Sequence, residues 1–300
     1  MNGGFILIET RLLYYFLAVA REQNITKAAE VLHITQPSLS KQMYDLEDRL
    51  GKKLLIRGNK STTLTEDGAY FRGKAEEIVQ LMENTISSFD VSDTISGTIS
   101  LGCAETEKMS IITKALKKIT VNYNKITFKI HSGNANDVLE RLDKGLLDVG
   151  LLINPAFNDR YDYLKMPFYD VFGLLVNTNS PLAKKERIEP KDILNTPLLM
   201  SSQEHGTAVI ESWLNKSMNE LNIKAYYNLI YNATHMVEQE IGSALCISDL
   251  VNCAECRNLK FIPLYPELKA ELYIVTKKYQ NKSKALELFL NEIKNVITSN

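Results

Sequence analysis

The segment from Thr35 to Lys41 carries side chains that could read the edges of DNA bases. Short hydroxyls, an amide and one cation are gathered here, and these groups hydrogen-bond to major-groove edges and to phosphates. Thr35 is a suitable N-cap for a helix, and Pro37 would lie in its first turn, where a missing N–H costs nothing. Asp45 and Asp48 follow and would repel phosphate. The pattern therefore predicts a helix whose N-terminal half meets DNA.

A helix-turn-helix is the element that would position this segment. An apolar stripe of Leu39, Met43, Leu46 and Leu50 lies within about 40° of Leu39 around the helix axis. A first helix ends near residues 22–24, and we expect Thr26 to cap a short second helix over 27–32. The turn is predicted at residues 33–34.

A basic hairpin is predicted directly after the third helix. Two short β-rich pieces flank Gly58-Asn59, and Arg57 with the nearby lysines at 52, 53 and 60 could touch the DNA backbone or minor groove. The alternative is a three-helix structural bundle with a solvated charged face. The hairpin and its basic tip favour DNA binding. The candidate DNA contacts are Thr26, Thr35, Gln36, Pro37, Ser38, Ser40, Lys41 and Arg57.

A long helix is predicted after Thr65, which can cap it. Its apolar positions alternate by four and three, which is typical of a seam for another helix. They are Phe71, Ala75, Ile78, Met82, Thr85 and Phe89. An ordinary helix covering its own domain is the alternative. Because the N-terminal module offers no nearby partner segment, we expect a partner from a second chain.

From Gly97 onward the sequence alternates between strand and helix patterns. Strands are expected over 98–103, 126–132, 147–153, 171–177, 197–201, 224–230, 244–248, 260–264 and 270–276. Helices are expected over 109–121, 137–144, 211–220, 235–241 and 284–296. Such alternation predicts parallel sheets that bind ligands at the carboxyl ends of their strands. Two such sets, with two crossings of the chain, indicate two lobes and a cleft.

Polar residues in the strand-to-helix turns are the candidates for this cleft. Each could instead simply cap its helix, but several such caps facing one cleft favour a binding site, and helix N-termini suit anionic ligands. The carboxylate of Glu105 departs from this pattern and would favour a ligand carrying an amine. The candidate effector contacts are Glu105, Thr106, Asn134, Ser202, Gln203, Asn232 and Thr234.

The N-terminal module resembles the winged helix-turn-helix of LysR-type transcriptional regulators. The residues that carry the resemblance are Ala28-Ala29, the run from Leu32 to Gln42, Leu46-Glu47, Leu50-Gly51 and Leu64-Thr65 with Gly68. The resemblance implies a DNA-binding regulator whose linker helices pair into a dimer. It also implies an effector domain like the periplasmic binding proteins, with the strand-to-helix turns that carry these effector candidates lining its pocket. The family begins near Ile8-Glu9, so Met1–Leu7 receives no role.

Composition limits the remaining possibilities. The net charge is −1, but residues 1–64 hold nine Lys/Arg against six Asp/Glu, which fits a small module that meets phosphate. No apolar run is long enough to span a membrane, and no signal peptide is evident, so we expect a cytoplasmic protein with reduced thiols. Cys253 and Cys256 form a CxxC pair without a second ligand pair, and the four histidines show no metal motif. We expect no cofactor, no metal and no enzyme.

The resulting interpretation is an α+β multidomain chain. It comprises a winged helix-turn-helix over 1–65, a linker helix over 66–94 and a two-lobed α/β effector domain over 95–300. The first lobe takes about 95–164 and 268–300, and the second about 165–267. Expected partners are operator DNA with inverted-repeat half-sites, a small-molecule effector, a second copy or a tetramer of the chain, and RNA polymerase. The rival interpretation is a solute-binding or enzymatic α/β protein with a vestigial helical domain.

Overall fold

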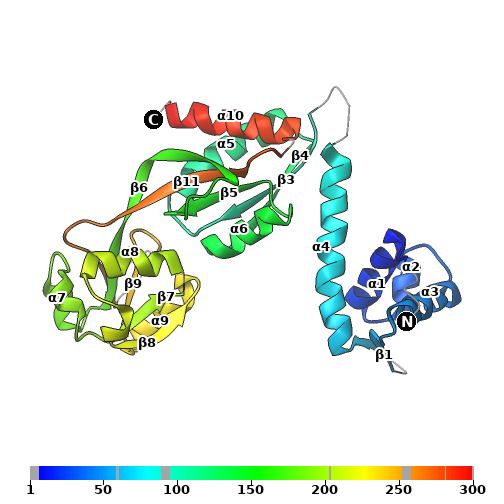
Figure 1. Cartoon of the computed structure of the whole chain (residues 1–300), viewed down its shortest axis with the longest axis horizontal. Coiled ribbons are helices and arrows are strands. Elements are labelled where there is room, and N and C mark those ends of the chain that lie inside the picture. The colour runs from blue at the N-terminus through cyan, green and yellow to red at the C-terminus, as the bar shows by residue number, and fades with distance from the viewer. Residues whose placement is uncertain are drawn as a thin grey trace. The chain divides into compact units, whose positions relative to one another are not determined.

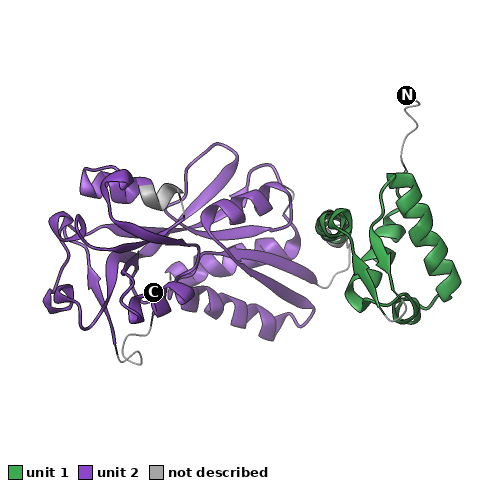
Figure 2. Ribbon diagram, turned by 90° about the horizontal axis from the view of Figure 1, so that it is seen from below, with its two compact units in different colours: residues 1–89 green, residues 90–300 purple. Residues whose placement is uncertain are grey.

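The computed structural model describes residues 7–58, 61–88, 95–202, 204–251, 258–280 and 282–298, with the backbone alone at 87, 88 and 204–207. The chain divides into two compact units, residues 1–89 and 90–300 (Figure 2). The predicted contacts Lys60 and Gln203 lie outside the described residues, as does Asn59 of the predicted hairpin turn. The N-terminal extension up to residue 6 does so as well.

The first unit is a winged helix-turn-helix followed by a long helix (Figure 1). Its elements are α1 (Thr10–Glu22), α2 (Ile25–Val31), α3 (Gln36–Leu50), the antiparallel hairpin β1 (Leu55–Arg57) and β2 (Thr62–Leu64), and α4 (Glu66–Ser88). The predicted stripe of α3 forms the core, since Leu39, Met43 and Leu46 are fully buried against Phe16 of α1. The turn between α2 and α3 places His33 in the left-handed region with φ of 54°.

The prediction that Thr26 caps α2 is wrong. Asn24 is the capping residue, because its backbone is extended and its side-chain Oδ1 accepts the N–H of Lys27 at 3.0 Å. The helix therefore begins at Ile25, and Thr26 lies exposed within its first turn. Thr35 does occupy the N-cap position of α3, although its side chain makes no capping hydrogen bond.

Helix α4 begins as the sequence predicts, with the Thr65 hydroxyl accepting the N–H of Gly68 at 2.9 Å. The expectation that this helix finds no partner within its own module is wrong. Phe71 packs edge-on against Phe16 with ring centroids 5.0 Å apart, and Ala75 is fully buried. These two positions of the predicted seam therefore cover the helix-turn-helix core, while Ile78 stays half exposed. Phe89 lies outside the described residues.

The second unit contains a nine-stranded sheet with helices packed on it. Its strands are β3 (Gly97–Cys103), β4 (Ile126–Ser132), β5 (Val149–Ile153), β6 (Tyr161–Asn177), β7 (Leu198–Ser201), β8 (Ile223–Tyr227), β9 (Ser243–Ile247), β10 (Leu259–Pro263) and β11 (Lys269–Lys277). Its α-helices are α5 (Met109–Asn122), α6 (Ala135–Asp143), α7 (Pro190–Ile193), α8 (Glu204–Leu214), α9 (Ile230–Glu238) and α10 (Lys284–Thr298).

The sheet is mixed, whereas the sequence pattern predicted parallel sheets. Strand order is β4-β3-β5-β11-β6-β9-β7-β8, with β10 beside β6. The β4-β3-β5 and β8-β7-β9 sets are parallel, but β6, β10 and β11 pair antiparallel. The chain from Ile153 to Tyr161 carries no helix, and parallel strands need a longer crossover than that.

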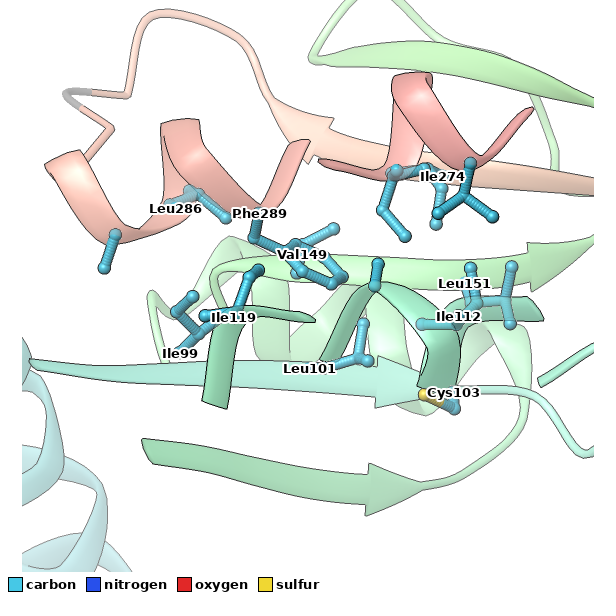
Figure 3. Close-up of a cluster of buried hydrophobic side chains, with 14 of the residues drawn as sticks. Ile99, Leu101, Cys103, Ile112, Ile119, Val149, Leu151, Ile274, Leu286 and Phe289 are labelled. Atoms are coloured by element: carbon cyan, nitrogen blue, oxygen red, sulfur yellow. The ribbon is translucent and has the colours of Figure 1, made fainter. Parts of the chain in front are cut away.

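Two hydrophobic cores define two lobes within this unit. In the first lobe, α5 and α10 bury Ile112 and Phe289 against Leu101 and Val149 of the sheet (Figure 3). In the second lobe, the core around Leu174, Leu198 and Ile210 joins β6, β7 and α8. Strand β6 passes from the first core to the second, and β11 returns to the first. The two predicted crossings are these two strands.

Two helices of the second lobe begin earlier than predicted. Helix α8 starts at Glu204, and α9 starts at Ile230, which the sequence pattern placed in a strand. The apolar residues from Tyr226 to Tyr231 suit a strand by composition. In the structure, Ile230 instead begins the buried face of a helix. The buried residues of α9 are Ile230, Ala233, Thr234 and Val237, which follow helical spacing.

Candidate functional site

The N-terminal half of α3 presents a polar surface. Gln36, Pro37, Ser38 and Lys41 are exposed, and Ser40 is partly buried. The Gln36 amide donates to the Ser40 hydroxyl at 3.0 Å, so these two polar groups lie side by side. No described residue forms a hydrogen bond or ion pair with Lys41. The structure therefore gathers the predicted α3 contacts on one surface that carries a free cation.

A buried carboxylate joins α3 to the wing, the β1–β2 hairpin. The Glu47 side chain is 2% exposed, and its Oε1 accepts the N–H groups of Leu54 and Leu55 at 2.8 and 3.0 Å. Its Oε2 accepts from the Arg57 guanidinium at 3.1 Å. That guanidinium also stacks on the Tyr44 ring, 3.5 Å from its centroid. Arg57 is thus held within the module, which limits its predicted role as a DNA contact.

The lysines at the base of the wing are also engaged. Lys52 Nζ lies 3.1 Å from Asp67 on α4, and Lys53 Nζ lies 3.6 Å from Glu47. Both pairs are largely solvent-exposed on the lysine side, so DNA phosphates could still compete for them. The sequence pattern named both lysines as possible backbone contacts of the hairpin, outside the list of candidate DNA contacts.

The two lobes enclose a small inner cavity of about 90 Å³. Ala104, Glu105 and Ile153 contribute from the first lobe, and Phe172 and Leu245 are among the residues from the second. An outer cleft of about 690 Å³ continues from it and shares four lining residues, Ala104, Glu105, Ile230 and Leu250.

Three predicted effector residues line these spaces. Glu105 lines both, and Thr106 and Thr234 line the outer cleft. The Thr234 hydroxyl donates to the carbonyl of Tyr231 at 2.6 Å, so it is committed within α9. The Thr106 hydroxyl donates to the buried carboxylate of Asp170 at 2.6 Å. It therefore ties the β3–α5 turn to the crossing strand β6.

The environment of Asp170 is electrostatically unusual. Its side chain is fully buried, and burial raises the pKa of its carboxyl, although Thr106 and Lys108 oppose this effect. The ammonium of Lys108 lies 3.4 Å from its Oδ1. Lys108, which stands between the lining residues Glu107 and Met109 in the sequence, is thereby engaged by a buried acid.

The other predicted effector residues within the described ranges do not line the inner cavity or the outer cleft. Asn134 caps α6, its Oδ1 accepting the N–H of Asp137 at 2.9 Å. Ser202 is exposed, and the neighbouring Ser201 lines the cavity instead. Asn232 lies exposed in the first turn of α9, because the strand-to-helix turn comes earlier.

Several lining residues escaped sequence reasoning. Asn228 and Leu229 form the true β8–α9 turn, which was missed because α9 was expected to begin later. Asp249 and Leu250 follow β9 and line the outer cleft. Both residues could have been predicted from the sequence, because they follow a predicted strand and ligands bind at the carboxyl ends of such strands.

The thiols and possible metal ligands add no further site. Cys103 and Cys246 are buried, and Cys253 and Cys256 lie outside the described residues. Within the described ranges, no group of three or more His, Cys, Asp or Glu side chains is arranged to hold a metal ion. Nor do those ranges contain a helix of sufficient length and apolarity to cross a bilayer.

Family models match both parts of the chain. The model described as "Bacterial regulatory helix-turn-helix protein, lysR family" matches residues 10–69, and "LysR substrate binding domain" matches residues 92–298. The Hca operon transcriptional activator HcaR of Escherichia coli is 26% identical over 241 residues, covering 79% of this chain and 81% of its own. The HTH-type transcriptional regulator BsdA of Bacillus subtilis is 29% identical over 224 residues, covering 72% of this chain and 74% of its own.

Solved structures share the fold across the whole chain. Full-length CbnR, in a crystal structure with its target DNA, aligns with a TM-score of 0.70 at 18% identity, covering 96% of this chain and 100% of that one. The crystal structure of HinK, a LysR family transcriptional regulator from Pseudomonas aeruginosa, aligns with a TM-score of 0.56 at 20% identity, covering 96% of this chain and 98% of that one.

Proposed function

The chain belongs to the LysR family of DNA-binding, effector-controlled transcriptional regulators, and we propose that it reads operator DNA through the N-terminal half of α3 as a dimer. The observation that carries this proposal is the polar surface around Gln36, Ser40 and Lys41, whose cation has no partner among the described residues. A helix presenting such groups at its N-terminal end is the usual reader of a major groove.

Dimerisation is supported by the exposed apolar residues of α4. Tyr70, Ile78 and Leu81 are 71%, 50% and 45% exposed, and they lie within about 80° of one another around the helix axis. The side that carries Ala75 and Val79 is already buried within the module. A second copy of α4 would cover the exposed side and would present two α3 helices to two half-sites of an inverted repeat. Pairing of dimers would give a tetramer.

Control by a small molecule is the second part of the proposal. An effector enclosed by both lobes would stabilise one arrangement of them, and it must bind that arrangement better in order to change DNA binding. Glu105, which lines both the inner cavity and the outer cleft, is the leading contact. Contact with RNA polymerase at the promoter and a cytoplasmic location complete the proposed role, and no catalytic step is part of it.

The direct test is binding of the purified full chain to DNA flanking its own gene. We expect a specific shift in a gel assay that unlabelled flanking DNA abolishes and unrelated DNA does not. Hydroxyl-radical footprinting should then show two protected patches about one helical turn, or a multiple of it, apart. Absence of specific binding at low salt would overturn the proposal and favour a solute-binding α/β protein.

A further inference from the structure

The inner cavity has a single charged side chain among its described lining residues, Glu105. Most of the remaining lining is apolar and includes Ile153, Phe172, Leu229, Ile230, Leu245 and Leu250. Glu105 is partly buried in these surroundings, and a cation or hydrogen-bond donor that reaches its carboxylate would stabilise it.

Glu105 has no such partner within the protein as described. No hydrogen bond or ion pair joins it to another described residue. Other polar side chains of the cavity are committed: the Tyr227 hydroxyl donates to a β9 carbonyl at 2.6 Å, and Asn154 bonds to the β11 backbone at 2.8 and 3.1 Å. The Asn228 Oδ1 accepts the N–H of Leu229 at 2.9 Å. Glu105 is therefore available to a ligand.

The outer cleft adds negative rather than positive charge. Glu107, Glu238 and Asp249 line it, and its one basic lining residue in the described part of the chain is His235. His235 is engaged by Glu238, with 3.0 Å between Nδ1 and Oε2. Lys108, the neighbour of Glu107 in the sequence, is held by the buried Asp170. A ligand carboxylate entering here would meet several carboxylates and no uncommitted cation among these groups.

We propose that the effector is a small amphipathic amine whose apolar group fills the inner cavity and whose ammonium pairs with Glu105. The inference rests on the proposed function, because it names the ligand class of the effector site. The cavity volume of about 90 Å³ is smaller than the roughly 150 Å³ cavity that accommodates benzene. The apolar group of the effector is therefore expected to be small.

The test compares three probes of matched shape: 3-methylbutylamine, 3-methyl-1-butanol and 4-methylpentanoate. Calorimetry with the full chain at neutral pH should show the amine binding about 10- to 100-fold more tightly than either of the others, the range expected for a hydrogen bond to a charged group. Glu105→Gln should reduce amine affinity by a similar factor and leave alcohol affinity unchanged. Glu140→Gln, on the exposed surface of α6, is the matched control and should behave as wild type.

Equal or better binding of the carboxylate, or amine binding no stronger than that of the alcohol, would overturn the inference. Wild-type amine affinity in Glu105→Gln would do so as well. Circular dichroism and thermal unfolding of each variant confirm that it is folded. DNA binding is measured on the same preparations, so that loss of the amine preference with DNA binding intact contradicts this inference alone.

Discussion

Cys103 lies at the end of β3, and burial raises the pKa of its thiol to about 12. At pH 8 only about one in ten thousand such thiols would be ionised, and the thiolate is the reactive form. We therefore expect iodoacetamide to leave Cys103 unmodified in the native protein and to modify it after unfolding in guanidinium. Peptide mapping by mass spectrometry gives the readout, and rapid native labelling of Cys103 would contradict the burial described here.

Two glycines of α4 should respond oppositely to the same substitution. A Cβ at Gly68 would come within 2.1 Å of the Leu54 carbonyl oxygen, whereas a Cβ at Gly73 would meet nothing within 4 Å. Gly68→Ala should therefore destabilise the first unit by about 1–3 kcal/mol or more through overpacking. Gly73→Ala should stabilise α4 by about 0.5–1 kcal/mol, because alanine loses less backbone entropy in a helix. Urea unfolding measures the unfolding free energy of both variants. Equal changes in the two variants would contradict the close approach of Gly68 to the Leu54 carbonyl oxygen.

Individual residues were predictable where their role depends on one element. The polar surface of α3 could be predicted, because one helix sets the spacing from Gln36 to Lys41. The partner of Arg57 could not, since Glu47 reaches it only after the wing folds back onto α3. The role of Asn134 could not be predicted from the sequence either. A polar residue in a turn can cap its helix or bind a ligand, and Asn134 caps α6.

At the scale of elements, Glu47 fixes the wing to α3. Glu47→Ala would leave two backbone N–H groups and a guanidinium without their shared acceptor, so we expect a loss of about 3 kcal/mol in the stability of this contact. Hydrogen-exchange mass spectrometry should show lost protection at Leu54 and Leu55. Asp48→Ala, at an exposed site of the same helix, should change stability by no more than about 0.5 kcal/mol. Unchanged protection in Glu47→Ala would show that the wing is held by other contacts.

The exposed side of α4 should control self-association. The double substitution Ile78→Glu and Leu81→Glu places two charges in the proposed dimer contact, so we expect the dimer to dissociate at concentrations where the wild type remains associated. Sedimentation velocity measures the change. Tyr279→Glu, at a fully exposed site of the second unit, is the control and should sediment as wild type. A double variant that remains associated would place the dimer contact elsewhere.

Elements differ in how far the sequence specifies them. Strand β4 was predicted over its full length, whereas β6 extends well before the predicted start. Its first half, from Tyr161 to Asp170, alternates between buried and exposed positions irregularly, because it pairs with β11 on one side and continues toward the second lobe. The length of β6 depends on its pairing within the whole sheet, so the local sequence pattern does not predict it.

At the scale of the whole molecule, basic residues are in excess only in the N-terminal module. Residues 1–64 carry an excess of three basic groups, while the chain as a whole has a net charge of −1. Residues 65–300 carry an excess of four acidic groups, so the N-terminal 64 residues are the part of the chain suited to meeting phosphate. We propose that phosphate is met through α3, where Lys41 supplies a cation with no partner among the described residues.

The salt dependence of DNA binding tests that claim most directly. The affinity of the full chain for its flanking DNA is measured by fluorescence anisotropy over a range of salt concentrations, for the wild type, Lys41→Ala and the exposed control Lys224→Ala. Loss of a phosphate contact should weaken binding and flatten the slope of log affinity against log salt by about one for each protomer, or about two for a dimer. Lys224→Ala should reproduce the wild type. Unchanged affinity and slope in Lys41→Ala would contradict the account, because this surface of α3 would then not meet DNA.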